Sequence, residues 1–407
     1  MPKTKILLTA STFPRWENDT EPEFILQLAQ ALSDSFRVLV LAPHCQGAAS
    51  RETLGEVSVY RYRYAPAALE SLAYGGGIMS NLAAKPWRWL LVPGLLLSQL
   101  NSVRKLCREE NIALVHAHWI VPQGLALLLG SWLGMKFPPI LITSHGADLF
   151  SLRSKPLRWL KLQILKRAQR VNVVSTAMLK ETAALGLDND KVFVRSMGVD
   201  LQHRFVDTTP WEQRSGLIFV GRLVEKKGVA TLIRAISLLT PRYPNLQLNI
   251  IGDGPLRASL QALATTLGCA GNITFAGAIP NQKIPALLNQ HRIALVPSVI
   301  ARDGDQEGLG LVAVEAMGCG CAVICSDLPA LGDVVEQGKT GILVTPGDSE
   351  ALASAILDLL RDDELCTGLA TNGKQSALAR FDWPGVAAEY AKQYAQLCQA
   401  EANNSPR

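Results

Sequence analysis

Short hydrophobic runs alternate with longer segments of helical periodicity along the first half of the chain. These runs are KILLTAS at 5–11, FRVLVLAP at 36–43, ALVHAHW at 113–119, PILITSHG at 139–146 and RVNVVS at 170–175. Apolar runs of this length are typical of buried strands, and their alternation with helical segments indicates parallel strands joined by crossover helices. The first half therefore predicts a doubly wound α/β domain.

The same alternation begins again at Gly216. Its runs are GLIFVGRL at 216–223, LQLNIIGDG at 246–254, ITFAGAI at 273–279, IALVPS at 293–298, CAVICSD at 321–327 and TGILVTP at 340–346. A chain of 407 residues also exceeds what one hydrophobic core usually serves. We therefore expect two Rossmann-like parallel-sheet domains, at 1–198 and 199–380, joined by a polar linker and hinge near 198–214.

The composition is that of a soluble enzyme, with 48% hydrophobic and 18% charged residues. The opening MPKTKILLTAS is too short and too polar for a signal peptide, and no apolar stretch approaches the ~20 residues that a bilayer crossing needs. Eight scattered cysteines indicate a reducing compartment, and Cys319, Cys321 and Cys325 have no neighbouring residues to complete a metal site. We expect a cytoplasmic protein without a bound metal.

The net charge of +5 divides unevenly, because residues 1–198 carry +9 and residues 199–407 carry −4. Basic residues gather at 152–170, where leucines and Trp159 are interleaved and no acidic residue occurs, and again in KPWRWLL at 85–91. Such segments suit peripheral contact with the inner, anionic face of the cytoplasmic membrane. A helix that packs its leucines on the sheet and exposes its cations explains 152–170 equally well. A nucleic-acid partner is not expected, because no recognisable binding module is present.

Several charged residues follow the predicted strands, where sites form in open parallel sheets. In FVGRLVEKKG, Arg222 comes directly after a strand and Lys227 lies five residues later, so both can converge on a diphosphate. In DGDQEGLGLVAVEAM, we expect Glu307 in a loop and Glu315 inside the following helix. Free N–H groups at that helix start offer a seat for an anion between the two carboxylates. A nucleotide-sugar, with hydroxyls at both ends and phosphate between, suits this arrangement.

These motifs resemble the retaining glycosyltransferases of family 4, whose GT-B fold has two facing Rossmann-like domains. The resemblance runs through FVGRLVEKKG, IIGDGPLR, the Glu307/Glu315 pair and TGILVTPGD, and so covers nearly the whole chain. STFPRWENDTEPEF and the DGDQEG context are similar to the subgroup that builds bacterial surface and exopolysaccharides. The resemblance implies that the helix at 381–400 crosses back onto the first domain, which binds the acceptor, while the second binds the donor.

The resemblance also implies residue roles. Arg222 and Lys227 would hold the diphosphate and offset charge on the leaving nucleotide, without a cofactor or a divalent metal. Glu315 would accept hydrogen bonds from the ribose, Glu307 would position the donor sugar, and His145 of TSHGAD would line the sugar pocket. The donor site would be completed by Gly252, Gly254, Gly308, Leu309 and Gly310.

On the acceptor side, the loop after the first strand departs from the family, because FPRWENDTEPEF replaces the Gly-Gly pair that many members carry. We expect Arg15 and Glu23 near the acceptor, although both could be solvated loop charges. His118 would help to shape the cleft, and Asp148 would either fix its loop or meet the acceptor.

The predicted function is transfer of a sugar, with retained configuration, from a UDP-sugar to a saccharide or lipid-linked saccharide. A non-catalytic nucleotide-sugar sensor and a GT-B nucleotide-sugar epimerase remain alternatives. A dehydrogenase is not expected, since STFPRWEND lacks the G-x-G-x-x-G turn.

Overall fold

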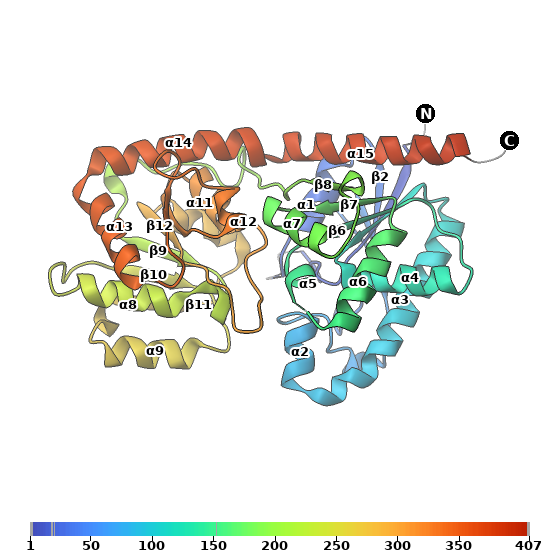
Figure 1. Cartoon of the computed structure of the whole chain (residues 1–407), viewed down its shortest axis with the longest axis horizontal. Helices are drawn as coiled ribbons and strands as arrows, with labels where there is room; N and C mark the ends of the chain where they lie inside the picture. Colours follow the sequence, from blue (N-terminus) through green and yellow to red (C-terminus); the bar gives the residue numbers. More distant parts are fainter. Residues whose placement is uncertain (1–2, 18, 20, 152, 405–407) are drawn as a thin grey trace. The chain divides into compact units, whose positions relative to one another are not determined.

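The computed structural model describes residues 3–17, 19, 21–151 and 153–404 of the chain. Two compact units divide it: the first contains residues 1–174, 178–198 and 383–407, and the second contains 175–177 and 199–382. Each unit is built on its own sheet (Figure 1).

The first unit contains an eight-stranded sheet in the order β3-β4-β2-β1-β5-β6-β7-β8. All neighbouring strands are parallel except β3 and β4, which form an antiparallel edge. The strands are β1 (Lys5–Thr9), β2 (Arg37–Pro43), β3 (Arg51–Leu54), β4 (Val57–Tyr62), β5 (Leu114–His118), β6 (Ile140–Ser144), β7 (Arg170–Val173) and β8 (Val192–Val194). The predicted strands at the centre of this sheet are confirmed, whereas β3, β4 and β8 were not predicted.

Helices cover this sheet, and three of them, α3, α4 and α6, pack in a row (Figure 1). The helices that contribute to this unit are α1 (Phe24–Ala31), α2 (Ile78–Ala84), α3 (Val92–Glu109), α4 (Leu125–Trp132), α5 (Ala147–Phe150), α6 (Lys155–Arg167), α7 (Thr176–Ala184) and α15 (Trp383–Asn404).

The last helix, α15, packs on the first unit beside α1 and β5. Its Tyr390 and Tyr394 are fully buried, and each hydroxyl has a partner: Asn172 donates to Tyr390 across 2.7 Å, and Tyr394 lies 2.6 Å from Nδ1 of His116. Buried aromatic side chains with paired hydroxyls fix a helix firmly. The predicted return of the C-terminal helix to the first domain is confirmed.

The second unit contains a six-stranded parallel sheet in the order β11-β10-β9-β12-β13-β14. Its strands are β9 (Leu217–Val220), β10 (Leu248–Ile251), β11 (Ile273–Gly277), β12 (Ile293–Val296), β13 (Ala322–Ser326) and β14 (Ile342–Val344). Its helices are α8 (Val229–Leu239), α9 (Arg257–Thr266), α10 (Ile284–Leu288), α11 (Leu311–Gly318), α12 (Pro329–Gly332), α13 (Ser349–Arg361) and α14 (Asp363–Phe381). Strands such as β13 are buried along their whole length, which explains their continuous apolar sequence. The predicted class of two parallel α/β sheets is confirmed.

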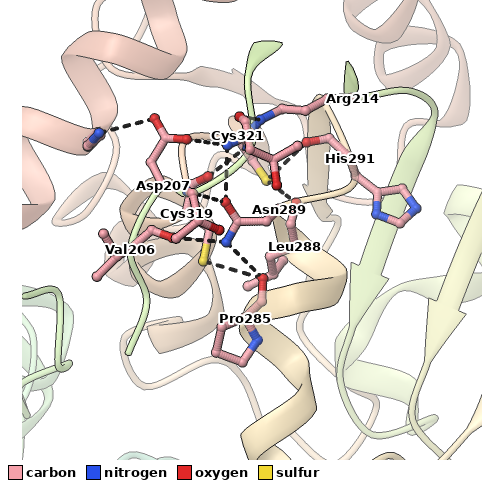
Figure 2. Close-up of polar contacts among 12 residues, drawn as sticks. Val206, Asp207, Arg214, Pro285, Leu288, Asn289, His291, Cys319 and Cys321 are labelled. Atoms are coloured by element: carbon pink, nitrogen blue, oxygen red, sulfur yellow. Dashed lines mark hydrogen bonds and ion pairs between the residues drawn. The ribbon is translucent and has the colours of Figure 1, made fainter. Parts of the chain in front are cut away.

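A buried arginine fixes the second part of the predicted linker to the second unit (Figure 2). Arg214 is 3% exposed and donates to Asp207 and, across 3.2 Å, to Oδ1 of Asn289. The Asn289 amide in turn donates to the Val206 carbonyl oxygen across 2.9 Å. Because these contacts hold 206–214 as part of a folded unit, this part of the linker is not a free hinge.

Among the described residues, no helix combines the length and the apolar character that a bilayer crossing requires. Cys319, Cys321 and Cys325 are buried, and burial raises the pKa of each thiol, so they act as small core residues.

Candidate functional site

In the second unit, the predicted site residues lie on three loops that follow neighbouring strands. The loops at 221–228, 252–255 and 297–310 follow β9, β10 and β12, which are adjacent in the sheet. Since carboxyl ends of parallel strands meet at one edge of a sheet, the fold brings together segments that are far apart in sequence.

Lys227 and Glu307 form an ion pair between two of these loops, with Nζ 2.6 Å from Oε2. Burial raises the pKa of Glu307, but Lys227, Lys226 and hydrogen bonds from Lys227 and Gly308 outweigh it and hold the pKa below its usual value. Glu307 is therefore ionised near neutral pH and compensates Lys227. Lys226, which the sequence reasoning did not single out, pairs with Asp305 across 3.0 Å.

Arg222 lies directly after β9 and is exposed. Its loop is held by the neighbouring glycines: a Cβ on Gly252 would meet the Gly221 carbonyl oxygen at 1.9 Å, and one on Gly254 would meet that of Leu223 at 2.5 Å. The backbone N–H of Gly252 already donates to Gly277. Gly252 and Gly254 therefore allow the two loops to pack closely, and this packing fixes the backbone position of Arg222.

Helix α11 begins one residue after Gly310, whose φ of +90° is one that side chains rarely adopt. A Cβ there would lie 2.4 Å from Leu331, so glycine is required for packing as well. Gly308, Leu309 and Gly310 are buried and lead directly into the N-terminus of α11. In its first turn, the Ala313 N–H donates to the Gly310 carbonyl oxygen across 2.9 Å. This is the segment where the sequence predicts a seat for an anion.

Glu315 lies in the second turn of α11 and is partly exposed, while Glu307 lies in the preceding loop. Burial raises the pKa of Glu315 to about 7, and Arg204 and Lys227 act in the opposite direction. Sequence reasoning missed Arg204 because it lies within the segment interpreted as a linker. Glu307 is thus ionised near neutral pH, whereas Glu315 gains its charge as the pH rises through about 7.

In the first unit, His145 follows β6 and is partly exposed. Its ring packs against Phe24 and Trp119, with centroids 5.1 and 4.8 Å away, and burial lowers its pKa to about 3. The imidazole is therefore neutral at any physiological pH.

Asp148 is buried beside His145 and fixes two strand ends. Its carboxylate accepts hydrogen bonds from the Ile120 N–H at 2.7 Å, the Ser144 hydroxyl at 2.8 Å and the His145 N–H at 3.2 Å. Of the two predicted roles, this geometry favours that of fixing the loop.

His118 is fully buried at the end of β5, and its Nδ1 lies 3.0 Å from Nε2 of His145. The structure thus brings these two predicted residues together. His116 on the same strand forms hydrogen bonds with Thr143 and Tyr394, and its ring packs against that of His118 with centroids 4.1 Å apart. It therefore connects the two histidines to the packing of α15.

Arg15 and Glu23 lie in the segment after β1, but the structure gives Arg15 other partners. Its guanidinium donates to Asp19 across 2.5 and 2.8 Å and stacks over Trp16 at 4.4 Å. Glu23 is the residue before α1 and makes no capping hydrogen bond with its side chain. Arg15 is therefore an ordered side chain and not a freely solvated charge.

The second unit combines cations, a helix N-terminus and two carboxylates of unlike protonation, which is suited to a diphosphate with hydroxyl groups on both sides. Within the described ranges, no group of three histidine, cysteine or acidic residues could hold a metal ion.

Two protein families match the chain. The family described as Glycosyltransferase Family 4 matches residues 23–203, and the one described as Glycosyl transferases group 1 matches residues 206–376. Together the two matches span most of the chain.

Two curated relatives are similar over part of their length. The GDP-mannose-dependent alpha-(1-6)-phosphatidylinositol monomannoside mannosyltransferase of Mycolicibacterium smegmatis is 32% identical over 199 residues, which is 49% of this chain and 51% of that protein. The putative colanic acid biosynthesis glycosyltransferase WcaL of Salmonella typhimurium is 28% identical over 230 residues, 55% of this chain and 56% of that protein. The chain therefore matches about half the length of these relatives.

Solved structures are similar over nearly the whole chain. Sucrose-phosphate synthase from Thermosynechococcus elongatus has a TM-score of 0.77 at 22% identity, covering 98% of this chain and 100% of that one. Anabaena HepE in complex with UDP has a TM-score of 0.70 at 20% identity, covering 97% and 100%. At these identities the likeness concerns the fold, which is GT-B-like.

Proposed function

Because the chain belongs to glycosyltransferase family 4, we propose that it moves a sugar, with retained anomeric configuration, from a UDP-sugar to a saccharide or lipid-linked saccharide acceptor. We place this reaction in the synthesis of a bacterial surface polysaccharide. The observation that carries the proposal is the pairing of Lys227 with Glu307 beside the N-terminus of α11, with Glu315 one helical turn further.

In this proposal the second unit holds the donor. Arg222 and Lys227 contact the diphosphate and stabilise the charge that develops on UDP as the glycosidic bond breaks. The N–H groups after Gly310 add a fixed positive potential at the same place. Because these groups are already cationic or dipolar, neither a divalent metal nor a cofactor is needed.

Each of the two glutamates binds one end of the donor. Ionised Glu315 accepts hydrogen bonds from the ribose hydroxyls, and Glu307 accepts them from the sugar while staying close to Lys227. The pairing of Glu307 with a lysine makes it a positioning group and a weak nucleophile, so retention follows from attack on the face that the leaving phosphate occupies. That phosphate then accepts the proton of the acceptor hydroxyl.

The first unit contributes neutral His145 to the sugar pocket and, through Arg15 and Glu23, contacts to the acceptor. Because His145 is neutral, it can form a hydrogen bond with a sugar hydroxyl without adding charge next to the reacting carbon. Asp148 supports the loop that carries His145.

Uridine is the proposed nucleoside of the donor. The solved Anabaena protein is described with UDP, whereas the name of the mycobacterial relative specifies GDP-mannose. The choice therefore has to be measured with both nucleotides.

The test is a thermal-shift and product-release screen of the chain against UDP-sugars and GDP-sugars. A productive donor should raise the melting temperature of the wild type and release nucleotide when an acceptor is present. Lys227→Ala and Glu315→Ala should lose the shift, while Lys339→Ala, an exposed lysine paired with Glu336 elsewhere in the second unit, should keep it. Binding without product release with any acceptor would favour the sensor, and conversion of the free nucleotide-sugar would favour the epimerase.

We also propose that a surface formed by residues 85–91 together with α3, α4 and α6 contacts the cytoplasmic face of an anionic membrane. Residues 71–167 contain twelve lysines and arginines against three acidic residues, a net charge of +9 that equals that of the whole first half. The same segment exposes large apolar side chains: Trp87, Trp89, Leu90, Leu97, Trp132, Leu133 and Trp159. Cations with exposed tryptophans are the combination that binds the interface of anionic lipids.

Segment 152–170, apart from Leu152, which lies outside the described residues, has both a buried face and an exposed tryptophan, which is consistent with either of the two roles that its sequence suggested. Ile164 and Leu165 of α6 are buried against the unit, and Lys161 is buried with its ammonium donating to two backbone carbonyl oxygens. Trp159, on the same helix, is 56% exposed. In the 85–91 segment, Trp89 and Leu90 are 56% and 81% exposed.

Sedimentation with vesicles tests this surface. The chain should bind vesicles of phosphatidylglycerol and phosphatidylcholine but not of phosphatidylcholine alone, and Trp89→Ser with Leu90→Ser should weaken binding. Leu238→Ser, on a helix of the second unit with a 52% exposed side chain, is the control. Equal binding to both vesicle types would contradict the electrostatic part of the proposal.

A further inference from the structure

Three histidines lie together where β5 and β6 end, and the proposed reaction uses only one of them. His116 and His118 point to the same side of β5 because side chains alternate along a strand, and His145 follows β6. The rings of His118 and His145 are nearly parallel, with centroids 5.2 Å apart and an interplanar angle of 17°. His118 is 0% exposed, so it does not touch a ligand directly.

The contact between His118 Nδ1 and His145 Nε2, at 3.0 Å, is a hydrogen bond between two imidazoles. Burial lowers the pKa of both rings, so each is neutral and carries one proton. In a bond between neutral imidazoles one nitrogen donates and the other accepts, so the tautomer of one ring dictates that of the other.

The two directions of this bond differ in what they leave buried. Nε2 of His118 has no hydrogen-bond partner among the described residues. If His145 donated, His118 would be protonated at Nε2, and this buried N–H would have no acceptor. If His118 donates from Nδ1, its Nε2 is instead an acceptor without a donor. Buried N–H groups without an acceptor are rarer in proteins than acceptors without a donor.

We propose that His118 donates from Nδ1 to Nε2 of His145 and thereby holds His145 as its Nδ1–H tautomer. His145 then presents a hydrogen-bond donor through Nδ1, which makes no hydrogen bond within the described residues, to an oxygen of the donor sugar. His118 is a positioning residue, and this inference rests on the proposed role of His145.

The surroundings of His145 are consistent with a ring held in one orientation. Trp119 packs on it while its own backbone has φ of +78°, a conformation rare for a residue other than glycine. The Trp119 N–H donates to Thr143 across 2.7 Å, and the next N–H, that of Ile120, donates to Asp148. These bonds tie the ends of β5 and β6 together, so His118 and His145 stay in register.

The experiment is ¹⁵N NMR of histidine-labelled protein, which distinguishes protonated from bare ring nitrogens, combined with steady-state transfer kinetics. The wild type should show Nδ1–H for His145 between pH 6 and 8. In His118→Phe the second tautomer should appear, and kcat should fall by roughly ten- to a hundredfold, the size typical of losing a partner that orients a histidine. The donor KM and the affinity for UDP, which the second unit binds, should stay within about threefold.

His118→Asn is the conservative variant, because the amide nitrogen of asparagine can take the place of Nδ1 and donate to His145. It should restore one tautomer and most of kcat. The control is His116→Asn, which removes the contacts of that ring with Tyr394, Thr143 and the His118 ring but leaves both partners of the His118–His145 bond in place. It should keep the Nδ1–H tautomer of His145.

Three outcomes would overturn the inference. They are Nε2–H at His145 in the wild type, an unchanged tautomer in His118→Phe, or equal kcat losses in His118→Phe and His118→Asn. His145→Ala separates this failure from that of the proposed function: if His145→Ala keeps full transfer activity, the role assigned to His145 is wrong, whatever the tautomer shows.

Discussion

Nζ of Lys227 lies 2.6 Å from Oε2 of Glu307, although the two residues are 80 positions apart in the sequence. A diphosphate that binds Lys227 must therefore share this ammonium with a carboxylate. The ion pair holds the Lys227 side chain in a defined position at the proposed diphosphate site.

Changing Glu307 to Gln should separate binding of the nucleotide from transfer. Removing the carboxylate frees the charge of Lys227, so we expect UDP to bind about three- to tenfold more tightly. Transfer should fall by about ten- to a hundredfold, because a charged hydrogen bond to the sugar is lost. Calorimetry with UDP and a transfer assay check both values, and weaker UDP binding would contradict the arrangement.

Lys227→Gln should weaken UDP binding by about ten- to a hundredfold, as expected for the loss of a charge-assisted hydrogen bond worth roughly 1.5–3 kcal/mol. The loss should shrink at high salt, because part of it is electrostatic. Lys339→Gln, an exposed lysine in the same unit, should bind UDP like the wild type.

Glu315 should make UDP affinity depend on pH. Its pKa of about 7 means that the carboxylate needed by the ribose forms as the pH rises through 7, so affinity should increase from pH 6 to 8. A phosphate group also ionises near pH 6, so the dependence must be compared with that of Glu315→Gln. That variant should bind more weakly at pH 8 and retain only the phosphate part of the pH dependence.

The same residue should affect stability in the opposite sense. Because the folded protein raises the pKa of Glu315 from 4.5 to about 7, the folded state binds this proton more tightly than the unfolded state does. The free energy of unfolding should therefore fall as the pH rises from about 4.5 to about 7, by at most about 3 kcal/mol. Urea unfolding at pH 8 should find Glu315→Gln more stable than the wild type, and equal or lower stability would contradict the assignment.

Gly254→Ala should disturb the loop at 221–228, which carries Arg222. The new Cβ would lie 2.5 Å from the Leu223 carbonyl oxygen, so the two loops must separate. We expect UDP binding to fall at least about tenfold, with a loss of stability of about 1–3 kcal/mol. Gly271→Ala is the control, since a Cβ there meets nothing within 4 Å.

Asp148→Asn should destabilise the first unit. An amide has one acceptor oxygen where the carboxylate accepts from Ile120, Ser144 and His145, so a buried donor loses its partner. The expected loss is about 1–3 kcal/mol, measured by urea unfolding. Asp190→Asn, in an exposed turn, should change stability by less than about 0.5 kcal/mol. Equal effects of the two variants would show that Asp148 does not fix the strand ends.

The strands that carry the site could be predicted from the sequence, because strands buried on both faces have continuous apolar runs such as IALV at 293–296. The edge strands could not: RETL at 51–54 is half charged, since an edge strand faces solvent and needs no apolar run. The loop position of Glu307 and the helical position of Glu315 likewise followed from the glycines between them.

The sequence by itself determined two parallel-sheet units and the kinds of side chain that follow their strands. The tertiary structure alone decided which of these side chains meet. The pairing of Lys227 with Glu307 and of His118 with His145 depends on which strands are neighbours, and sheet order is set by long-range packing that no local pattern encodes. The protonation of Glu315 depends likewise on burial, which exists only once the chain has folded.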